Sequence, residues 1–372
     1  MRGRGTRRVL RQLARLTRPV LAAPGAIAIA VYADALDRPV AANERGHEGV
    51  ACIDDAARAI LPLCDLWAAT REPFVRAWAG GLVEFLLYMQ ERDGRFVNFI
   101  SDWSGTKNGR GMTSFAGGSF WQARGVRGLA RAWLALDDPR AGRGVITGLR
   151  HVREAASPAD VRAIHVLTAI DLLRAGRLPE LRADLAIWAD ELVACRRDGV
   201  LYDNPDESEP HLWGHVQEAA LAEAGAFLDR PDLVDIARES CALYLEPLIA
   251  SGFDLASVQP YGVACAVAAT TALAARTGDA RFVRLAQDAR AWFHERNRAG
   301  RAVYDLTTGR VHDGIDDGVL NAHSGAESNI AAAEALSAEL PRIAAVHLRS
   351  LERILPLVPS TAAARGRAMW SE

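Results

Sequence analysis

The sequence predicts an all-α protein, an (α/α)6 toroid of six helical hairpins with short β-like pieces in three long loops. From Val50 onward, apolar residues recur at spacings of three and four, the period of helices with one buried face. Short turns rich in Asp, Pro and Gly divide this pattern into pairs of segments, and short links make antiparallel neighbours. Three longer loops recur between the pairs, and long loops in compact domains are usually functional.

The helical segments fall into successive pairs, each joined by a short turn. They are expected at 53–70 and 74–91, 119–136 and 141–156, 159–175 and 179–196, 212–228 and 232–249, 257–276 and 280–297, and 325–338 and 342–356. Turns such as Asp137-Asp138-Pro139 and Gly278-Asp279 are ordinary signals for the end of one helix and the start of the next. The chain of 372 residues therefore divides into a basic N-terminal segment at 1–24, a single toroid domain at 25–358, and a tail at 359–372.

The three long loops resemble one another. Gly94, Gly199 and Gly300 follow the second, sixth and tenth helices, and lie about 100 residues apart as in a weak internal repeat. Each glycine precedes a short β-like piece. Because these loops enter the inner helices from one end of the toroid, we expect the functional site at the start of those helices.

The composition excludes several classes of protein. The formal net charge is -2 and no basic stripe follows Arg18, so we expect no nucleic-acid partner. The five cysteines are scattered without a CxxC motif, which favours neither disulfides nor a zinc site. No run reaches the roughly 18 apolar residues that cross a membrane, and we expect a cytoplasmic protein. No glycine-rich nucleotide loop precedes a helix, so no cofactor is predicted.

Carboxylates at the predicted helix starts are the candidate catalytic groups. Asp54 and Asp55 begin the first helix, with Arg58 one turn later, and Glu218 and Glu327 begin later helices. Acidic residues also stabilise helix starts because free N–H groups lie there. A structural role therefore remains open, and Glu327 in particular fits a capping box.

Aromatic and polar side chains near these helix starts are the candidate substrate-binding residues. A sugar ring stacks on aromatic side chains, and its hydroxyls bind amides and carboxylates. The candidates are Arg58, Asn98, Asp102, Trp103, Trp121, Gln122, Trp213, His215, Tyr261, Asp313 and His323. For Trp103 and Trp121, a role in covering the core is an equal alternative.

Two histidines have a spacing that occurs in metal sites. His211 and His215 are four residues apart, and would share one helix face if both lay within the helix. Trp213 and Gly214 indicate that the helix begins between them. Because the sequence places no third ligand, we expect no metal site.

Three motifs occur in the same order as in a bacterial protein family. They are Asp-Asp-x-Ala-Arg at 54–58, GRFVNFISDW at 94–103, and a late block with Tyr-Asp-x-x-Thr-Gly and Gly-Ala-Glu-Ser at 304–328. The chain resembles the six-hairpin, glycosidase-like family often attached to, or encoded beside, retaining glycosyltransferases. This resemblance implies the (α/α)6 fold, a carbohydrate-directed site at the loop end, and a functional link to a glycosyltransferase.

The chain also departs from the pattern of that family. Where the family has Asp-Ser-His-Gly-Arg, this sequence has Gly-Ser-Phe-Trp-Gln at 118–122. The carboxylate, imidazole and guanidinium are replaced by glycine and bulky aromatics. Either the acid and base lie elsewhere, or the substrate is different and less polar.

The sequence thus predicts a carbohydrate-active enzyme for a small-molecule or oligosaccharide substrate, most simply a glycoside hydrolase. Its carboxylate pair would be Asp54 or Asp55 with Glu218 or Glu327, and we expect Asp55 to be ionised and Glu218 to be the acid. The two carboxyls would lie about 5–5.5 Å apart for retention or 6.5–9.5 Å for inversion. Three alternatives stay open: a sugar 2-epimerase with histidine bases, a terpene-cyclase-like toroid, and a glycan-binding toroid without activity. The sequence does not predict the oligomeric state.

Overall fold

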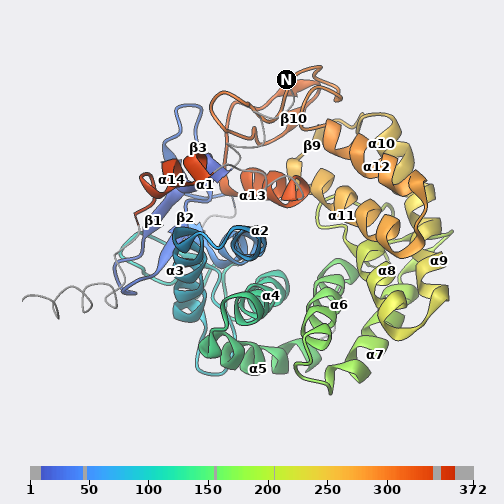
Figure 1. The fold of residues 1–372 in the computed structure, drawn as a ribbon, viewed down its shortest axis with the longest axis horizontal. Coiled ribbons are helices and arrows are strands. Elements are labelled where there is room, and N and C mark those ends of the chain that lie inside the picture. The colour runs from blue at the N-terminus through green and yellow to red at the C-terminus, as the bar shows by residue number, and fades with distance from the viewer. Residues whose placement is uncertain (1–9, 45–47, 155–156, 205, 338–344, 357–372) are drawn as a thin grey trace, which may run out of the picture.

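The structure is a computed structural model that describes residues 10–44, 48–154, 157–204, 206–337 and 345–356. It confirms the predicted all-α toroid, in which inner helices form a closed ring (Figure 1). The inner helices are α2 (Ile53–Thr70), α4 (Ser119–Leu136), α6 (Ala159–Arg174), α8 (Gln217–Leu228), α11 (Pro260–Thr277) and α13 (Ala326–Ala335). Each packs against the next, and α13 packs against α2 to close the ring.

The outer helices each follow an inner helix in the chain and pack on it. They are α3 (Pro73–Met89), α5 (Pro139–Glu154), α7 (Leu181–Ala194), α9 (Pro231–Ser240) and α12 (Ala280–Ala291). The fourth outer helix continues from α9 through a π-helical turn, η2 (Cys241–Leu245), into α10 (Glu246–Ala250). None of the described helices has the length and apolar composition needed to cross a bilayer.

The N-terminal helix α1 (Leu10–Leu16) covers the place where the ring closes. It packs against α13 and α14 (Ala345–Glu352) outside the ring (Figure 1). Leu10, Leu13 and Leu16 are almost fully buried. This part of the expected segment 1–24 therefore contributes to the toroid core, whereas the expected tail at 359–372 lies outside the described residues.

The ends of the inner helices explain the short turns. Arg71, Asp137, Asp229 and Gly278 follow α2, α4, α8 and α11, and all four adopt the left-handed conformation. A left-handed residue at this position ends a helix and reverses the chain. The helices also approach closely, because a Cβ on Gly128 of α4 would lie 2.9 Å from the Cα of Ala57 in α2.

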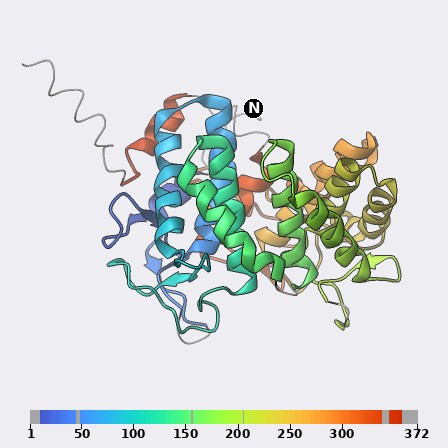
Figure 2. The same cartoon turned by 90° about the horizontal axis from the view of Figure 1, so that it is seen from below.

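Short antiparallel strands lie in the loops at the starts of the inner helices. They are β1 (Thr17–Pro19) with β2 (Ile27–Ile29), β3 (Tyr32–Ala33) with β4 (Pro39–Val40), β5 (Ala51–Cys52) with β6 (Phe99–Ile100), β7 (Arg196–Arg197) with β8 (Val200–Leu201), and β10 (Ile315–Asp316) with β9 (Ser257–Val258) and β11 (Val319–Leu320). Gly94, Gly199 and Gly300 share positive φ values of 95°, 85° and 57°. The loops after α3 and α7 extend beyond the helices at one end of the ring (Figure 2). We call this end the loop pole.

Candidate functional site

The loop pole contains a cavity of about 570 Å³, which we call the pole cavity. Four carboxylates line it: Glu44, Asp313, Asp316 and Glu327. Trp213, Tyr32 and His323 also line it, whereas no Lys or Arg of the described chain does. The charge of its walls therefore favours a neutral or cationic ligand over an anion.

Glu327, in the first turn of α13, connects the pole cavity to the inner ring. Its Oε2 lies 3.2 Å from Nη1 of Arg58, and its Oε1 accepts a hydrogen bond of 3.2 Å from Nε1 of Trp213. The side chain is 33% exposed. No side-chain capping bond forms at the start of α13, so the capping-box alternative is wrong. Two donors orient this carboxylate while it still faces the cavity.

Asp55 is a buried carboxyl beside the same ion pair. Its side chain receives a contact of 3.4 Å from Sγ of Cys52. Burial raises its pKa to about 7 against the opposing charge of Arg58, and the charges of Glu327 and Asp54 raise it further. We expected an ionised Asp55 because acidic residues at helix starts are stabilised as anions. Burial opposes that effect, and at a pKa of about 7 both forms of the carboxyl are present near neutral pH.

Tyr32 indicates that these groups belong to one site. Its ring lines the pole cavity. Burial, and then the charges of Glu44, Asp55 and Glu327, raise its pKa. Asp55, Glu44 and Glu327 thus act on the same phenol, because charges influence one another at short range in this way.

Asp54 points toward the neighbouring inner helix. Its Oδ2 lies 2.6 Å from Nη1 of Arg124, whose Nη2 donates a hydrogen bond of 2.9 Å to the hydroxyl of Tyr261. The backbone N–H of Asp54 donates to Oδ1 of Asn98 at 3.3 Å. Asn98 is thus a positioning residue for the start of α2.

Arg124 and Glu334 were not among the residues that the sequence indicated. Arg124 is 3% exposed, and Glu334 lies 3.7 Å from Nη2 of Arg58. Burial raises the pKa of Glu334, against the charges of Arg58 and Arg124. The spacing of Glu327 and Glu334 was an available signal, because residues seven apart lie on one helix face.

Aromatic residues at the pole contact the guanidinium groups of Arg58 and Arg124. Phe120 and Tyr261 each lie edge-to-face with Trp213, with ring centroids 5.3 Å apart. The guanidinium carbon of Arg124 lies 4.8 to 5.2 Å from all three ring centroids, and that of Arg58 lies 3.8 Å from the centroid of Tyr261. A terpene carbocation would need these rings, but cations of the protein already contact them.

Trp121 and Gln122 support the loop after α3. The Nε1 of Trp121 donates to the carbonyl oxygens of Phe96 and Phe115 at 3.1 and 2.8 Å. The side chain of Gln122 accepts from the N–H of Phe96 at 3.0 Å and donates to the carbonyl oxygen of Gly94 at 3.1 Å. Both side chains are buried. Trp121 therefore covers the core, as the alternative for this residue states. Gln122 holds the backbone of the loop after α3 through its hydrogen bonds.

Two further candidates on this loop lie outside the cavity walls that the structure describes. Asp102 is exposed and bonds the hydroxyl of Ser104, which lowers its pKa. Trp103 is half-buried and packs against the core. Neither lines the pole cavity.

Glu218 and His215 lie in the core behind the loop pole. Nε2 of His215 lies 2.9 Å from Oε1 of Glu218, and the hydroxyl of Ser240 donates to the same oxygen at 2.7 Å. Both residues are 0% exposed, and neither lines the pole cavity. The geometry therefore does not place Glu218 where a proton donor to a ligand in this cavity would lie.

Asp313 and His323, two of the predicted binding residues, line the pole cavity. Oδ1 of Asp313 accepts a hydrogen bond of 2.7 Å from the N–H of Gly325. Burial raises the pKa of Asp313, and that hydrogen bond opposes the rise. His323 is exposed at the cavity rim.

A second cavity, of about 420 Å³, lies among the inner helices beyond this polar layer. Arg58, Arg124 and Tyr261 line it together with apolar side chains such as Leu61 and Ile164. Because Arg58 and Tyr261 contact Glu327 and Trp213 of the pole cavity, these side chains form a layer between the two spaces.

These features define an (α/α)6 toroid with an acidic cavity at its loop pole, and solved structures of carbohydrate-processing enzymes share this fold. A sugar epimerase from a ruminal bacterium has a similar structure (TM-score 0.69, 9% identity, covering 89% of this chain and 96% of that chain). So does the cellobiose 2-epimerase from Bacillus thermoamylovorans B4167 (TM-score 0.67, 10% identity, 88% and 95%).

A family 76 glycoside hydrolase from a bovine Bacteroides thetaiotaomicron strain is similar as well (TM-score 0.63, 10% identity, covering 89% of this chain and 76% of that chain). No protein-family model matches the chain, and no curated protein matches it. At such low identities the likeness shows the fold alone.

Proposed function

We propose that the chain is a carbohydrate-active enzyme that hydrolyses a glycosidic bond in the pole cavity. One observation carries this proposal. Asp55, with a pKa of about 7, lies beside Glu327, which is ion-paired with Arg58. Glycoside hydrolysis needs one carboxyl that donates a proton and one that is ionised, and different environments separate the two roles.

The two carboxyls would divide the work according to their surroundings. Glu327 faces the cavity, and two donors hold it in place, which suits a nucleophile or a base. Asp55 is buried and exchanges its proton near neutral pH, which suits a general acid. Asp55 is 6% exposed and Glu218 0%. Asp55 is the stronger candidate for the acid because the charge of Glu327, which lines the cavity, acts on it, and its own charge acts on Tyr32 in the cavity wall.

The walls of the cavity favour a neutral or amino sugar as the substrate. Glu44, Asp313 and Asp316 can accept hydrogen bonds from hydroxyls. Trp213 and Tyr32 offer rings for the C–H faces of a sugar. A uronate or a sugar phosphate would meet the repulsion of these carboxylates.

Sugar epimerisation is the second candidate, because His323 lines the pole cavity. An imidazole has a pKa suited to proton abstraction next to a carbonyl. The mechanism with two histidine bases would need a second imidazole there. His215 is fully buried, and Nδ1 of His312 lies 2.6 Å from the carbonyl oxygen of Asn321. The carboxylate mechanism therefore has more support among the described residues.

The test is the release of reducing ends from a panel of neutral oligosaccharides and aryl glycosides. We expect Glu327→Gln and Asp55→Asn each to lower kcat by about 10²- to 10⁴-fold. Glu180→Gln is the matched control, because Glu180 is exposed at the start of the outer helix α7. Unchanged turnover in both variants would refute the carboxylate assignment, and turnover confined to uronates would refute the substrate class.

The resemblance to the family beside glycosyltransferases also supports a functional link to such an enzyme. The cytoplasmic location stays a prediction from the sequence. Co-expression of the chain with a neighbouring glycosyltransferase, followed by assay of the joint product, would test the link.

A further inference from the structure

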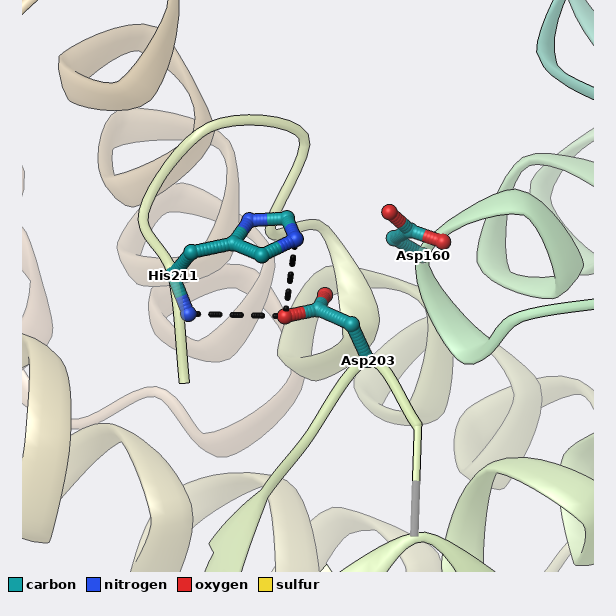
Figure 3. Close-up of side chains that lie close together, drawn as sticks. All are labelled: Asp160, Asp203 and His211. Atoms are coloured by element: carbon teal, nitrogen blue, oxygen red, sulfur yellow. Dashed lines mark hydrogen bonds and ion pairs between the residues drawn. The ribbon is translucent and has the colours of Figure 1, made fainter. Parts of the chain in front are cut away.

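A second polar cluster lies beside the pole cavity and takes no part in the proposed hydrolysis. Asp160 begins α6, and Asp203 and His211 belong to the loop after β8. One ligand atom from each of the three residues lies within 4.8 Å of the other two. Figure 3 shows the two carboxylates and the imidazole turned toward a common space, with His211 and Asp203 in contact. Nε2 of His211 is 3.2 Å from Oδ2 of Asp203.

The negative charge of this cluster is poorly neutralised by the protein. Asp160 and Asp203 are 3% and 1% exposed, and buried carboxylates need a compensating charge. Among the described residues, no cationic group lies within ion-pair distance of Asp160. Its Oδ1 accepts only the N–H of Val161, at 2.7 Å. The exposed His211 can neutralise at most one of the two carboxylates.

A fully buried imidazole points at the cluster with an unused nitrogen. His215 is 0% exposed, and its Nδ1 has no hydrogen-bond partner. That nitrogen lies 3.9 Å from Oδ1 of Asp203, while Nε2 contacts Glu218. Metal-ligating histidines commonly donate one ring N–H to a carboxylate and turn the other nitrogen toward the ion. The Glu218–His215 pair has this arrangement.

Hydrogen bonds from neighbouring residues hold Asp203 in place, as is usual for carboxylates that bind a metal ion. Nε2 of Gln217 donates a hydrogen bond of 2.7 Å to its Oδ1, and its carbonyl oxygen accepts the N–H of Ala159, at 2.7 Å. These bonds fix its loop to the start of α6. Such supporting bonds orient ligands around a bound ion.

We propose that Asp160, Asp203 and His211 bind a divalent transition-metal cation, with His215 oriented toward the site from the core. Two carboxylates match a charge of +2, and the imidazole favours Zn²⁺ or Mn²⁺ over Ca²⁺ or Mg²⁺. Metal–ligand bonds of about 2.1 Å place ligand atoms within about 4.2 Å of one another, so a small closure of the cluster suffices. The sequence predicted no metal site because Asp160 lies on the inner helix α6, far from His211 along the chain.

The bound ion would fix the segment that carries Trp213 against α6. His211 is two residues before Trp213, whose Nε1 contacts Glu327. Gly214 is also close, since a Cβ there would lie 3.8 Å from Oδ2 of Asp160. The metal is therefore a positioning element for one wall of the pole cavity, and it touches no reacting atom.

The test uses the full-length, untagged chain after treatment with a chelator and dialysis. Calorimetric titration with ZnCl₂ or MnCl₂ is expected to show one site per chain, with MgCl₂ and CaCl₂ at least about tenfold weaker. Saturating metal is expected to raise the melting temperature by about 3 °C or more. Binding of Co²⁺ is expected to give visible absorption bands typical of a metal site that includes a nitrogen ligand.

Variants then connect the ion to the three ligands. We expect His211→Ala and Asp160→Asn each to weaken binding at least about tenfold, and His151→Ala on the outer helix α5 to leave it unchanged. Because His211 is exposed, we expect His211→Ala to fold like the wild type, which far-UV circular dichroism checks. No stoichiometric binding, or binding that survives both His211→Ala and Asp160→Asn, would overturn the proposal. Equal affinity for Ca²⁺ would overturn the assignment to a transition metal.

Discussion

Replacement of Arg124 by Met is expected to destabilise the loop pole strongly. The guanidinium is 3% exposed and lies 2.6 Å from Asp54, and it also donates to Tyr261 at 2.9 Å. The substitution keeps much of the side-chain volume but removes the charge and both bonds. Asp54 then loses its ion-pair partner, and its Oδ1 already has no hydrogen bond.

The size of the effect follows from burial. Breaking a buried ion pair by removal of one partner costs about 3–5 kcal/mol. The side chain of Asp54 is 20% exposed, and water will solvate part of the stranded charge. We therefore expect a loss of about 3 kcal/mol in the free energy of unfolding, at the lower end of that range.

Urea denaturation at pH 7, followed by circular dichroism, measures this loss. Arg230→Met is the matched control, because Arg230 bonds Asp232 and Asp190 at exposed sites and such pairs contribute little to stability. Asp54→Asn combined with Arg124→Met closes a double-mutant cycle, and a direct interaction predicts a coupling above about 1 kcal/mol. A loss no larger than that of the control, or no coupling, would refute the role assigned to Arg124.

Further predictions concern the loops and the buried carboxyl. Gly94→Ala should lower the free energy of unfolding by about 3 kcal/mol, because φ is 95° and the Cβ would lie 2.5 Å from the carbonyl oxygen of Thr147. Gly300→Ala, with open space around the added Cβ, should lower it by about 1 kcal/mol. Equal losses for the two variants in urea denaturation would contradict this difference. Gln122→Leu should lower the free energy of unfolding by about 2–3 kcal/mol, because it leaves buried backbone groups of the loop after α3 without partners. A denaturation midpoint equal to that of the wild type would contradict this. Burial raises the pKa of Asp55 from 3.8 to about 7, so its protonated form stabilises the folded state below about pH 4, and this contribution is lost as the pH rises through 7. Relative to Asp55→Asn, the wild type should lose about 4 kcal/mol between pH 4 and pH 8; parallel curves of unfolding free energy against pH would show that the carboxyl is not buried as described.

Local signals made the fold predictable. Stop and start residues such as Asp137 and Gly278 act within a few positions of the chain, and the helices end where these residues predict. Two boundaries differ: α8 begins at Gln217 rather than near residue 212, and α12 ends at Ala291 rather than near residue 297. Gly214, with φ at 80°, keeps the segment with Trp213 outside the helix.

The site was less predictable because its contacts join different inner helices. Arg58 and Glu327 are 269 positions apart, and Arg124 and Asp54 are 70 apart. No local pattern states which helix starts face one another. Which carboxyls lie at the pole cavity depends on the same arrangement, so the sequence could name Asp55, Glu218 and Glu327 but not the surroundings of each.

A proton NMR time course of the wild-type chain with neutral oligosaccharides in D₂O distinguishes hydrolysis in the pole cavity from epimerisation. We expect new anomeric signals of reducing ends, absent for Glu327→Gln, with no loss of the signal of the proton at C2. Exchange of that proton without chain cleavage would instead establish epimerisation and contradict hydrolysis.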